Sequence, residues 1–402
     1  MSHSLMLPPS GADIWVPCAG SPLMATHCPP QQDTDATREG EASHWAVATV
    51  LKSYTNDGHT NTPLTLIGTV APNGIILTED MIECAEVMIH DVLEVCQEFG
   101  LLSKLHIEEK MRIPGIHKQC FGTPDVWAWD VSRGYLWVWD YKYGHKSVPP
   151  DSWQNKCYVK GAIDVIDSID DITGHTDQTT NVVMRVVQPR SYHDGGPVKE
   201  WHGIISDLRG DFNLLHSQAQ KVVSPNPDLV PGLHCRYCPA RHQCPASRET
   251  AASDVEYSYA AIPEVLTDEG LSFEKTIVDA AIERLKHRKE ALDTDMLNRI
   301  SYHKGVIPGY DTKQGTGNRS FNAPNAEIFV LGDLLGVDMH GPEKTITVAE
   351  FERRVKAKNR QRKIDGKELI DPTVINGYIT KANTSIKLVP SDQSDAKRIF
   401  SK

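Results

Sequence analysis

The sequence predicts an α/β protein with a central mixed sheet flanked by helices. Apolar residues recur at helical spacing between Thr78 and Gly100, which indicates a core helix. On both sides of Ser132-Arg133-Gly134, tryptophan and β-branched residues alternate with smaller or polar ones, which indicates a hairpin. The apolar run over 181–189 is typical of a buried strand. Because helices and strands alternate along the chain, the sheet is expected to be covered by helices.

Composition limits the class of protein. The chain has 402 residues, 40% of them hydrophobic, which predicts two or three domains at roughly 150 residues each. The net charge of −11 argues against a protein that coats nucleic acid, although a local basic patch can still meet phosphates. The N-terminus has no leader pattern, and no run of ~18 apolar residues occurs, so we expect a cytoplasmic protein without a membrane partner. In that compartment nine cysteines indicate metal binding rather than disulfides.

Before the hairpin, the sequence predicts a loop, two helices and one strand. The first forty residues are expected to form a tethered loop or short helix around Ile14–Val16. A helix from Glu39 to about Tyr54 carries His44 on its apolar face, where a histidine is more often a core residue than a ligand. Thr78 is an N-cap and Gly100 a stop for the next helix. Residues 105–113 alternate and are expected to form one strand that feeds the hairpin.

The hairpin from Gly122 to Gly144 places acidic residues at one end. Asp125 begins its first strand and Asp140 nearly ends its second, so antiparallel pairing makes them neighbours. Lys142 lies two residues after Asp140 and therefore points to the same face. Two carboxylates and a lysine suit metal-assisted hydrolysis of a phosphodiester. The alternative is that Asp125 is an ordinary turn residue and Asp-Tyr-Lys a chance sequence, and the hairpin alone does not separate these interpretations.

After the hairpin the pattern returns to helices and one strand. Val148-Pro149-Pro150 ends the sheet segment, and Asp151 or Ser152 caps a helix through about Ile166. On this helix Gln154 and Tyr158 lie one turn apart on the same side. The strand over 181–189 is followed by a helix from about Ser206 to Val223.

A cysteine cluster follows a linker that ends near Pro231. Cys235, Cys238 and Cys244 have the spacing Cys-x2-Cys-x5-Cys, which is typical of a metal centre. A fourth ligand must come from elsewhere in the chain. Zinc and an iron–sulfur cluster both fit at this stage. The candidates for the fourth ligand are Cys18, Cys28, His234 and His242.

The C-terminal region differs in composition. Polar helical patterns begin near Ala252 and include a long helix over 271–299, so we divide the chain into domains 1–250 and 251–402, the second mostly helical. Residues 304–321 are expected to be loop with short strands. The stretch 351–363 carries seven basic residues against one acidic residue. It is either a solvated helix face or an arm that contacts phosphates or a partner.

Four short motifs in order resemble the RecB-type branch of the PD-(D/E)XK nucleases, which share a restriction-endonuclease-like core. They are Gly40-x3-His44, Gly-Thr-Pro-Asp125, Asp140-Tyr-Lys142 and Gln154-x3-Tyr158. The resemblance implies that Mg2+ or Mn2+ is bound by His44, Asp125, Asp140 and the main-chain carbonyl of Tyr141. It also implies that Lys142 assists catalysis and that Gln154 and Tyr158 support the site and the DNA. Asp140 stands where Glu is common, and Glu41 replaces a small residue.

The cysteines extend this resemblance to the iron–sulfur type of these nucleases. In that type one cysteine precedes the histidine motif and three follow the core. Trp15-x2-Cys18-Ala-Gly-Ser is similar to the upstream part, so a [4Fe-4S] cluster on Cys18, Cys235, Cys238 and Cys244 is implied, with zinc as the alternative. An uncharacterised branch common in phages and prophages is similar nearly end to end. That likeness includes Val187-Gln188-Pro189-Arg190, Pro308-Gly309-Tyr310, Asn318-Arg319 and Leu388-Val389-Pro390.

The function implied by the resemblance is metal-dependent exonuclease action at DNA ends. The expected setting is phage recombination or replication in the host cytoplasm. DNA is the expected partner, together with a phage recombinase, a single-strand annealing protein or a helicase. The alternative is a non-catalytic DNA-end-binding accessory protein for recombination, although such a binder would not need Asp125, Asp140, Lys142 and His44 together.

Overall fold

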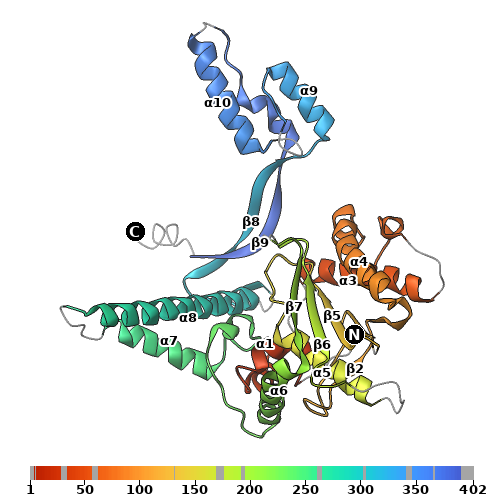
Figure 1. The fold of residues 1–402 in the computed structure, drawn as a ribbon. Helices are drawn as coiled ribbons and strands as arrows, with labels where there is room; N and C mark the ends of the chain where they lie inside the picture. Colours follow the sequence, from red (N-terminus) through yellow and green to blue (C-terminus); the bar gives the residue numbers. More distant parts are fainter. Residues whose placement is uncertain are drawn as a thin grey trace. The chain divides into compact units, whose positions relative to one another are not determined.

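The computed structural model describes residues 4, 6–28, 34–56, 62–130, 132–168, 176–191, 195–259, 265–301, 305–340, 346–364 and 367–390. The chain forms two compact units, Met1–Ala291 and Leu292–Lys402 (Figure 1). The first unit therefore continues past the expected domain boundary at residue 250. No helix among the described residues is long and apolar enough to cross a membrane.

The first unit contains most of the regular structure (Figure 1). Its helices are α1 (Ala12–Trp15), α2 (Ser21–Ala25), α3 (Asp35–Asn56), α4 (Glu79–Phe99), α5 (Trp153–Asp167), α6 (Arg209–Val222), α7 (Pro245–Tyr257) and the larger part of α8 (Asp268–Ser301). Its 3-10 helices are η1 (Pro9–Gly11), η2 (Pro63–Leu66), η3 (Leu102–Lys104), η4 (Ile205–Leu208) and η5 (Leu233–Tyr237). Its strands are β1 (His106–Ile107), β2 (Met111–Arg112), β3 (Phe121–Gly122), β4 (Val126–Asp130), β5 (Tyr135–Tyr141), β6 (Asn181–Val187) and β7 (Val198–Ile204).

The central sheet has the order β1-β4-β5-β6-β7. The β5–β6 pair is parallel and the other pairs are antiparallel, so the sheet is mixed. Helix α5 makes the crossover between the two parallel strands, as parallel pairing requires. The predicted α/β class with a central mixed sheet and flanking helices is confirmed.

The hairpin forms where the sequence placed it. Asp130 pairs with Tyr135 next to the turn, and Gly134 has φ +64°, a left-handed conformation that favours glycine. Alternate residues of β5 face opposite layers. Trp137 and Trp139 join the core beneath α3 and α4, whereas Leu136 and Val138 join the core beneath α5 and α6. Both faces of β5 are therefore buried, which fixes its register.

Helix ends follow their capping residues. The Thr78 hydroxyl accepts a hydrogen bond from Met81 N at 3.3 Å, and Gly100 ends α4 with φ +68°. The Ser152 hydroxyl accepts from Asn155 N at 3.3 Å and caps α5. The predictions for these two helices are confirmed, and α3 begins at Asp35, earlier than the predicted Glu39.

Two strand predictions of the first unit are corrected. The single strand predicted over 105–113 is wrong, because β1 pairs with β4 while β2 pairs with β3 in a separate ribbon. Between them Glu108 has φ +51°, which turns the chain from the central sheet to the β2–β3 ribbon. Strand β7 was not predicted, since its polar, glycine-containing sequence lies at an edge of the sheet where alternation is weak.

The second unit is built on a long two-stranded ribbon of β8 (Tyr310–Phe321) and β9 (Ile379–Pro390). Helices α9 (Asn325–Leu335) and α10 (Val348–Ile364) and 3-10 helix η6 (Pro372–Tyr378) follow β8 in sequence. The prediction of a loop with short strands is wrong for 310–321, which is one long strand. Register shifts after Gln314 and Thr316 accommodate the glycine-rich stretch that suggested a loop.

Candidate active site

The predicted pair of aspartates lies at one end of the β4–β5 hairpin. Val126 pairs with Trp139, which brings Asp125 beside the residues that end β5. The main-chain N–H of Tyr141 donates a hydrogen bond to Asp125 Oδ2 at 2.6 Å. The antiparallel argument from sequence therefore placed both carboxylates at the correct end of the sheet.

Asp140 is the centre of a buried polar network. Its Oδ1 accepts hydrogen bonds from Lys142 Nζ at 2.9 Å and from Gln154 Nε2 at 2.8 Å. Lys142 Nζ also donates to Gln154 Oε1 at 3.4 Å, so the three side chains form a closed triangle. Asp140 is 2% exposed, and its Oδ2 is buried without a hydrogen-bond partner among the described residues. A buried carboxylate oxygen in that state is unstable unless a cation or water binds it.

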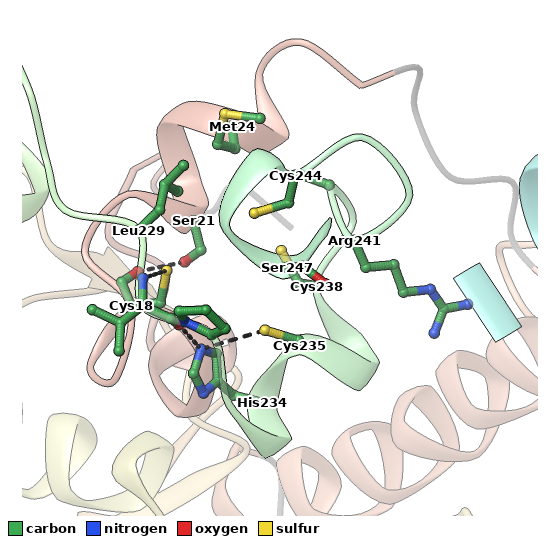
Figure 2. Close-up of a pocket in the computed structure, with 13 residues that line it drawn as sticks. Cys18, Ser21, Met24, Leu229, His234, Cys235, Cys238, Arg241, Cys244 and Ser247 are labelled. Carbon is green, nitrogen blue, oxygen red and sulfur yellow. Dashed lines mark hydrogen bonds between the residues drawn. The ribbon is translucent and has the colours of Figure 1, made fainter. Parts of the chain in front are cut away.

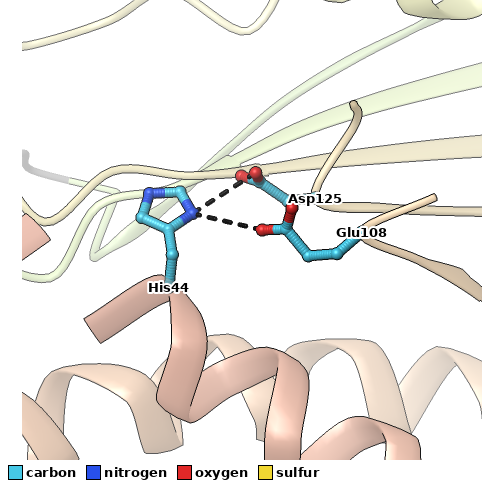
Figure 3. Close-up of side chains that lie close together, drawn as sticks. All are labelled: His44, Glu108 and Asp125. Carbon is cyan, nitrogen blue, oxygen red and sulfur yellow. Dashed lines mark ion pairs between the residues drawn. The ribbon is translucent and has the colours of Figure 1, made fainter. Parts of the chain in front are cut away.

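His44 reaches the same region from α3 (Figure 3). Its Nδ1 lies 3.3 Å from Asp125 Oδ1 and 3.9 Å from Glu108 Oε1. One ligand atom from each of these three residues lies within 4.8 Å of the others, the only such group of potential metal ligands among the described residues. The His44 ring also packs edge-on against Tyr141, with centroids 5.1 Å apart. His44 therefore contacts the Tyr141 ring on one side and directs its Nδ1 atom toward the two acids.

Glu108 is the site residue that sequence analysis missed. It lies at the break between β1 and β2, and its N–H donates to the Asp125 carbonyl at 2.9 Å. Its φ of +51° is uncommon for a residue with a side chain, and such strain concentrates at functional sites. The sequence offered no signal for this, because Glu108 falls within an alternating stretch that suggested one continuous strand.

Burial dominates the titration of the acids. It raises the pKa of Asp140 to about 6, with a further contribution from Asp125 and an opposing one from Lys142. Burial and then the Asp125 charge raise the pKa of Glu108 to about 7. Burial alone would raise the pKa of Asp125, but His44 and Lys142 outweigh it and hold that pKa below its usual value. A bound cation would favour all three ionised forms.

The remaining predicted residues support this group. Burial alone would lower the pKa of Lys142, but the Asp140 and Asp125 charges outweigh it, so Lys142 stays cationic. The Tyr158 hydroxyl donates to the Thr123 carbonyl at 3.2 Å and therefore anchors the loop that carries Asp125, without touching either acid. The Tyr141 hydroxyl lies 2.8 Å from Ser43 Oγ, so its side chain packs away from the acids. A role for the Tyr141 carbonyl as a ligand stays a prediction.

The donor set fits a hard divalent cation. Carboxylate oxygens suit Mg2+ and Mn2+, and the imidazole of His44 favours Mn2+. His44, Glu108 and Asp125 are the residues whose ligand atoms the structure brings together. Asp140 is not in this group, although its Oδ2 has no hydrogen-bond partner among the described residues, so its role as a ligand stays a prediction.

A second site gathers the cysteines. Cys18, Cys235, Cys238 and Cys244 line one pocket, and Figure 2 shows their sulfur atoms facing the same space. Cys18 comes from the connection between α1 and α2, and the other three come from η5 and the segment before α7. The Gly20 N–H donates to the Asp228 carbonyl at 2.8 Å, which ties the two distant segments together.

The atoms around the sulfurs distinguish Cys18 from the other candidates for the fourth ligand. Backbone N–H groups point at two of them: Val230 N to Cys18 Sγ at 3.4 Å, and Gly232 N to Cys235 Sγ at 3.3 Å. Burial raises the pKa of Cys238 to about 12, and neighbouring thiols add to the effect. Cys28 does not line the pocket, and its sulfur accepts from Gln243 Nε2 at 2.9 Å. Cys18 is therefore the fourth thiol of this site, and His234 is a lining residue that bonds to the Val230 carbonyl.

Fold and site together define an α/β protein with a partly buried acid–histidine–lysine group at the end of a hairpin and a separate four-cysteine pocket. The chain belongs to DUF2800, a family of proteins of unknown function, which matches residues 3–397. No curated protein matches the chain significantly.

Proposed function

We propose that this chain is a metal-dependent DNA exonuclease with the restriction-endonuclease-like core of the RecB-type PD-(D/E)XK nucleases. The observation that carries the proposal is the His44–Glu108–Asp125 group of potential ligands. Asp140, whose buried Oδ2 has no hydrogen-bond partner among the described residues, lies on the adjoining strand and is proposed as a further ligand. Lys142 lies in the same network, 2.9 Å from Asp140. A protein that only bound DNA would gain nothing from burying these acids together at a cost in stability.

In this proposal His44, Glu108, Asp125 and Asp140 hold Mg2+ or Mn2+, which would polarise the phosphate and activate water when bound. The protein's own groups position the reactants. Gln154 fixes both Asp140 and Lys142 through hydrogen bonds of 2.8 and 3.4 Å. Lys142, which stays cationic, would orient the attacking water and offset phosphate charge. Tyr158 anchors the loop that carries Asp125.

The four cysteines are proposed to hold a [4Fe-4S] cluster. A tetrahedral zinc ion with Zn–S bonds of about 2.3 Å needs sulfurs only about 3.8 Å apart. Among the described residues no three cysteine sulfurs all lie within 4.8 Å of one another, which favours the larger group in this proposal. Two N–H···S contacts suit the cluster, because hydrogen bonds to the sulfurs stabilise such clusters. Absorbance near ~400 nm from an anaerobic preparation would distinguish the cluster from colourless zinc.

The test is a nuclease assay on linear DNA labelled at its 5′ or 3′ end, with Mg2+ or Mn2+. We expect progressive loss of terminal nucleotides by the parent protein and at least about a hundredfold slower loss by Asp125→Ala and Asp140→Ala variants. Asp151→Ala is the matched control, because Asp151 is exposed. Variants as active as the parent would refute the site. A parent that binds DNA ends but cleaves nothing with either metal would favour the accessory binder.

A further inference from the structure

Charge is divided unequally between the two units. Residues 1–291 contain 24 Lys and Arg against 39 Asp and Glu, a formal charge of −15. Residues 292–402 contain 18 Lys and Arg against 14 Asp and Glu, a formal charge of +4. An acidic unit repels a polyanion at long range, so a basic unit on the same chain is suited to hold one.

The positive charge of the second unit concentrates on α10. This helix has seven Lys and Arg residues against Glu350 and Glu352. Its apolar residues Phe351 and Val355 are buried in the core of the second unit. Among the α10 side chains that the structure describes, the large apolar ones are thus turned into the core and not toward a lipid surface, and the basic face lies toward water.

Three of the cations share a groove. Lys356, Arg360 and Lys363 are exposed and line it together with Asn359 and Leu369. They are spaced by four and three residues, which puts them on one helix face at intervals of about 6 and 4.5 Å along the axis. Such a row of cations matches the regularly spaced charges of a nucleic-acid strand.

The one acidic residue that lines the groove is already paired. Glu352, which also lines the groove, forms an ion pair with Arg319 at 2.6 Å. Glu350 binds both Arg353 and Arg354. In the described part of the chain no ion pair involves the three cations that line the groove. These three side chains are thus available for an external anion.

We propose that this basic groove of α10 binds the phosphate backbone of DNA, as a binding surface separate from the candidate active site. The observations that carry the proposal are the three unpaired cations, the neutralised acid beside them and the burial of the helix's apolar face. Binding through backbone charge predicts little sequence preference and strong dependence on salt.

The test measures binding without cleavage. A fluorescent 30-base-pair duplex is titrated with the full chain in EDTA at several salt concentrations, and anisotropy is recorded. The variant is Lys356→Gln/Arg360→Gln/Lys363→Gln. The control, Lys104→Gln/Lys221→Gln/Lys275→Gln, removes the same charge from exposed positions in the first unit. Urea unfolding of each variant checks the fold, and polyglutamate and anionic vesicles replace DNA in parallel titrations.

We expect the groove variant to bind DNA at least about tenfold more weakly at 0.1 M salt, with a slope of log K against log salt smaller by about 3. The control should bind as the parent does. Equal binding by parent and groove variant, or an equal loss in the control, would overturn the proposal. A loss of binding to polyglutamate or vesicles with DNA binding unchanged would overturn it in favour of an acidic protein or a membrane. Because EDTA prevents cleavage, the outcome is independent of the proposed nuclease activity.

Discussion

Replacement of Asp140 by Asn should stabilise the metal-free protein while removing its metal response. The pKa of Asp140 is about 6 in the folded protein, against an ordinary value of 3.8. At ~1.4 kcal/mol for each pH unit, ionising this buried carboxyl costs about 3 kcal/mol of folding free energy at pH 8. The side-chain amide introduced by Asp140→Asn would place two N–H groups at the unpartnered Oδ2 position, at about 1 kcal/mol each, so the expected gain is about 1 kcal/mol.

The stability difference between wild type and Asp140→Asn should depend on pH. Because the folded pKa lies above the ordinary value, the neutral carboxyl contributes full stability below about pH 4, and that contribution is lost as pH rises through about 6. The wild-type protein should therefore lose stability between pH 4 and pH 7 at this group, and Asp140→Asn should not. Below pH 4 Asp140→Asn should be the less stable protein by about 2 kcal/mol, which is the cost of its unpaired amide N–H groups.

The assay is urea unfolding in EDTA and again with Mn2+, followed by tryptophan fluorescence. All eight tryptophans lie before Ala291, so the signal reports on the first unit. Mn2+ should stabilise the wild-type protein at pH 8 and leave Asp140→Asn unchanged, with Asp151→Asn as the control. If Asp140→Asn is less stable than wild type at pH 8 in EDTA, or gains as much from Mn2+, the reasoning about the buried carboxylate is refuted.

Four further outcomes are expected. Glu108→Gln should weaken Mn2+ binding by about 10–100-fold in calorimetric titration, and an unchanged affinity would remove Glu108 from the ligand set. Cleavage at limiting Mn2+ should rise between pH 5.5 and 8 as Asp140 and Glu108, with pKa values of about 6 and about 7, ionise; a flat kcat/KM profile would contradict this. Cys238→Ser should abolish absorbance near ~400 nm, whereas Cys28→Ser should keep it, and equal spectra would exclude the cysteine site. Gly20→Ala should destabilise the cysteine pocket by about 1–3 kcal/mol in thermal unfolding. The reason is that the alanine Cβ would lie 2.6 Å from Leu229 Cδ2 and 2.9 Å from the Asp228 carbonyl oxygen. Full iron content and unchanged unfolding would show that the close approach of Gly20 to Asp228 is not needed.

Local chemistry made part of the fold predictable. The hairpin turn at Gly134, the cap at Thr78 and the stop at Gly100 each depend on a few neighbouring residues, and all three are present. Antiparallel pairing then placed Asp125 beside the end of β5 without further information. Strand β7 was missed because its polar edge sequence alternates weakly, although it pairs with the preceding strand β6. The ribbon of β8 and β9 was missed because its pairing joins distant segments whose own patterns are weak.

The sequence by itself determined the hairpin, its two aspartates, Lys142 two residues after Asp140, and the close grouping of Cys235, Cys238 and Cys244, because each follows from spacing within a short segment. Only the tertiary structure decided that His44 faces the acids, that Glu108 joins them through a kink between the central sheet and the β2–β3 ribbon, and that Cys18 lines the same pocket as the other three cysteines. The physical reason is that these groups come together through long-range packing and backbone turns, whose energies depend on partners far away in the chain.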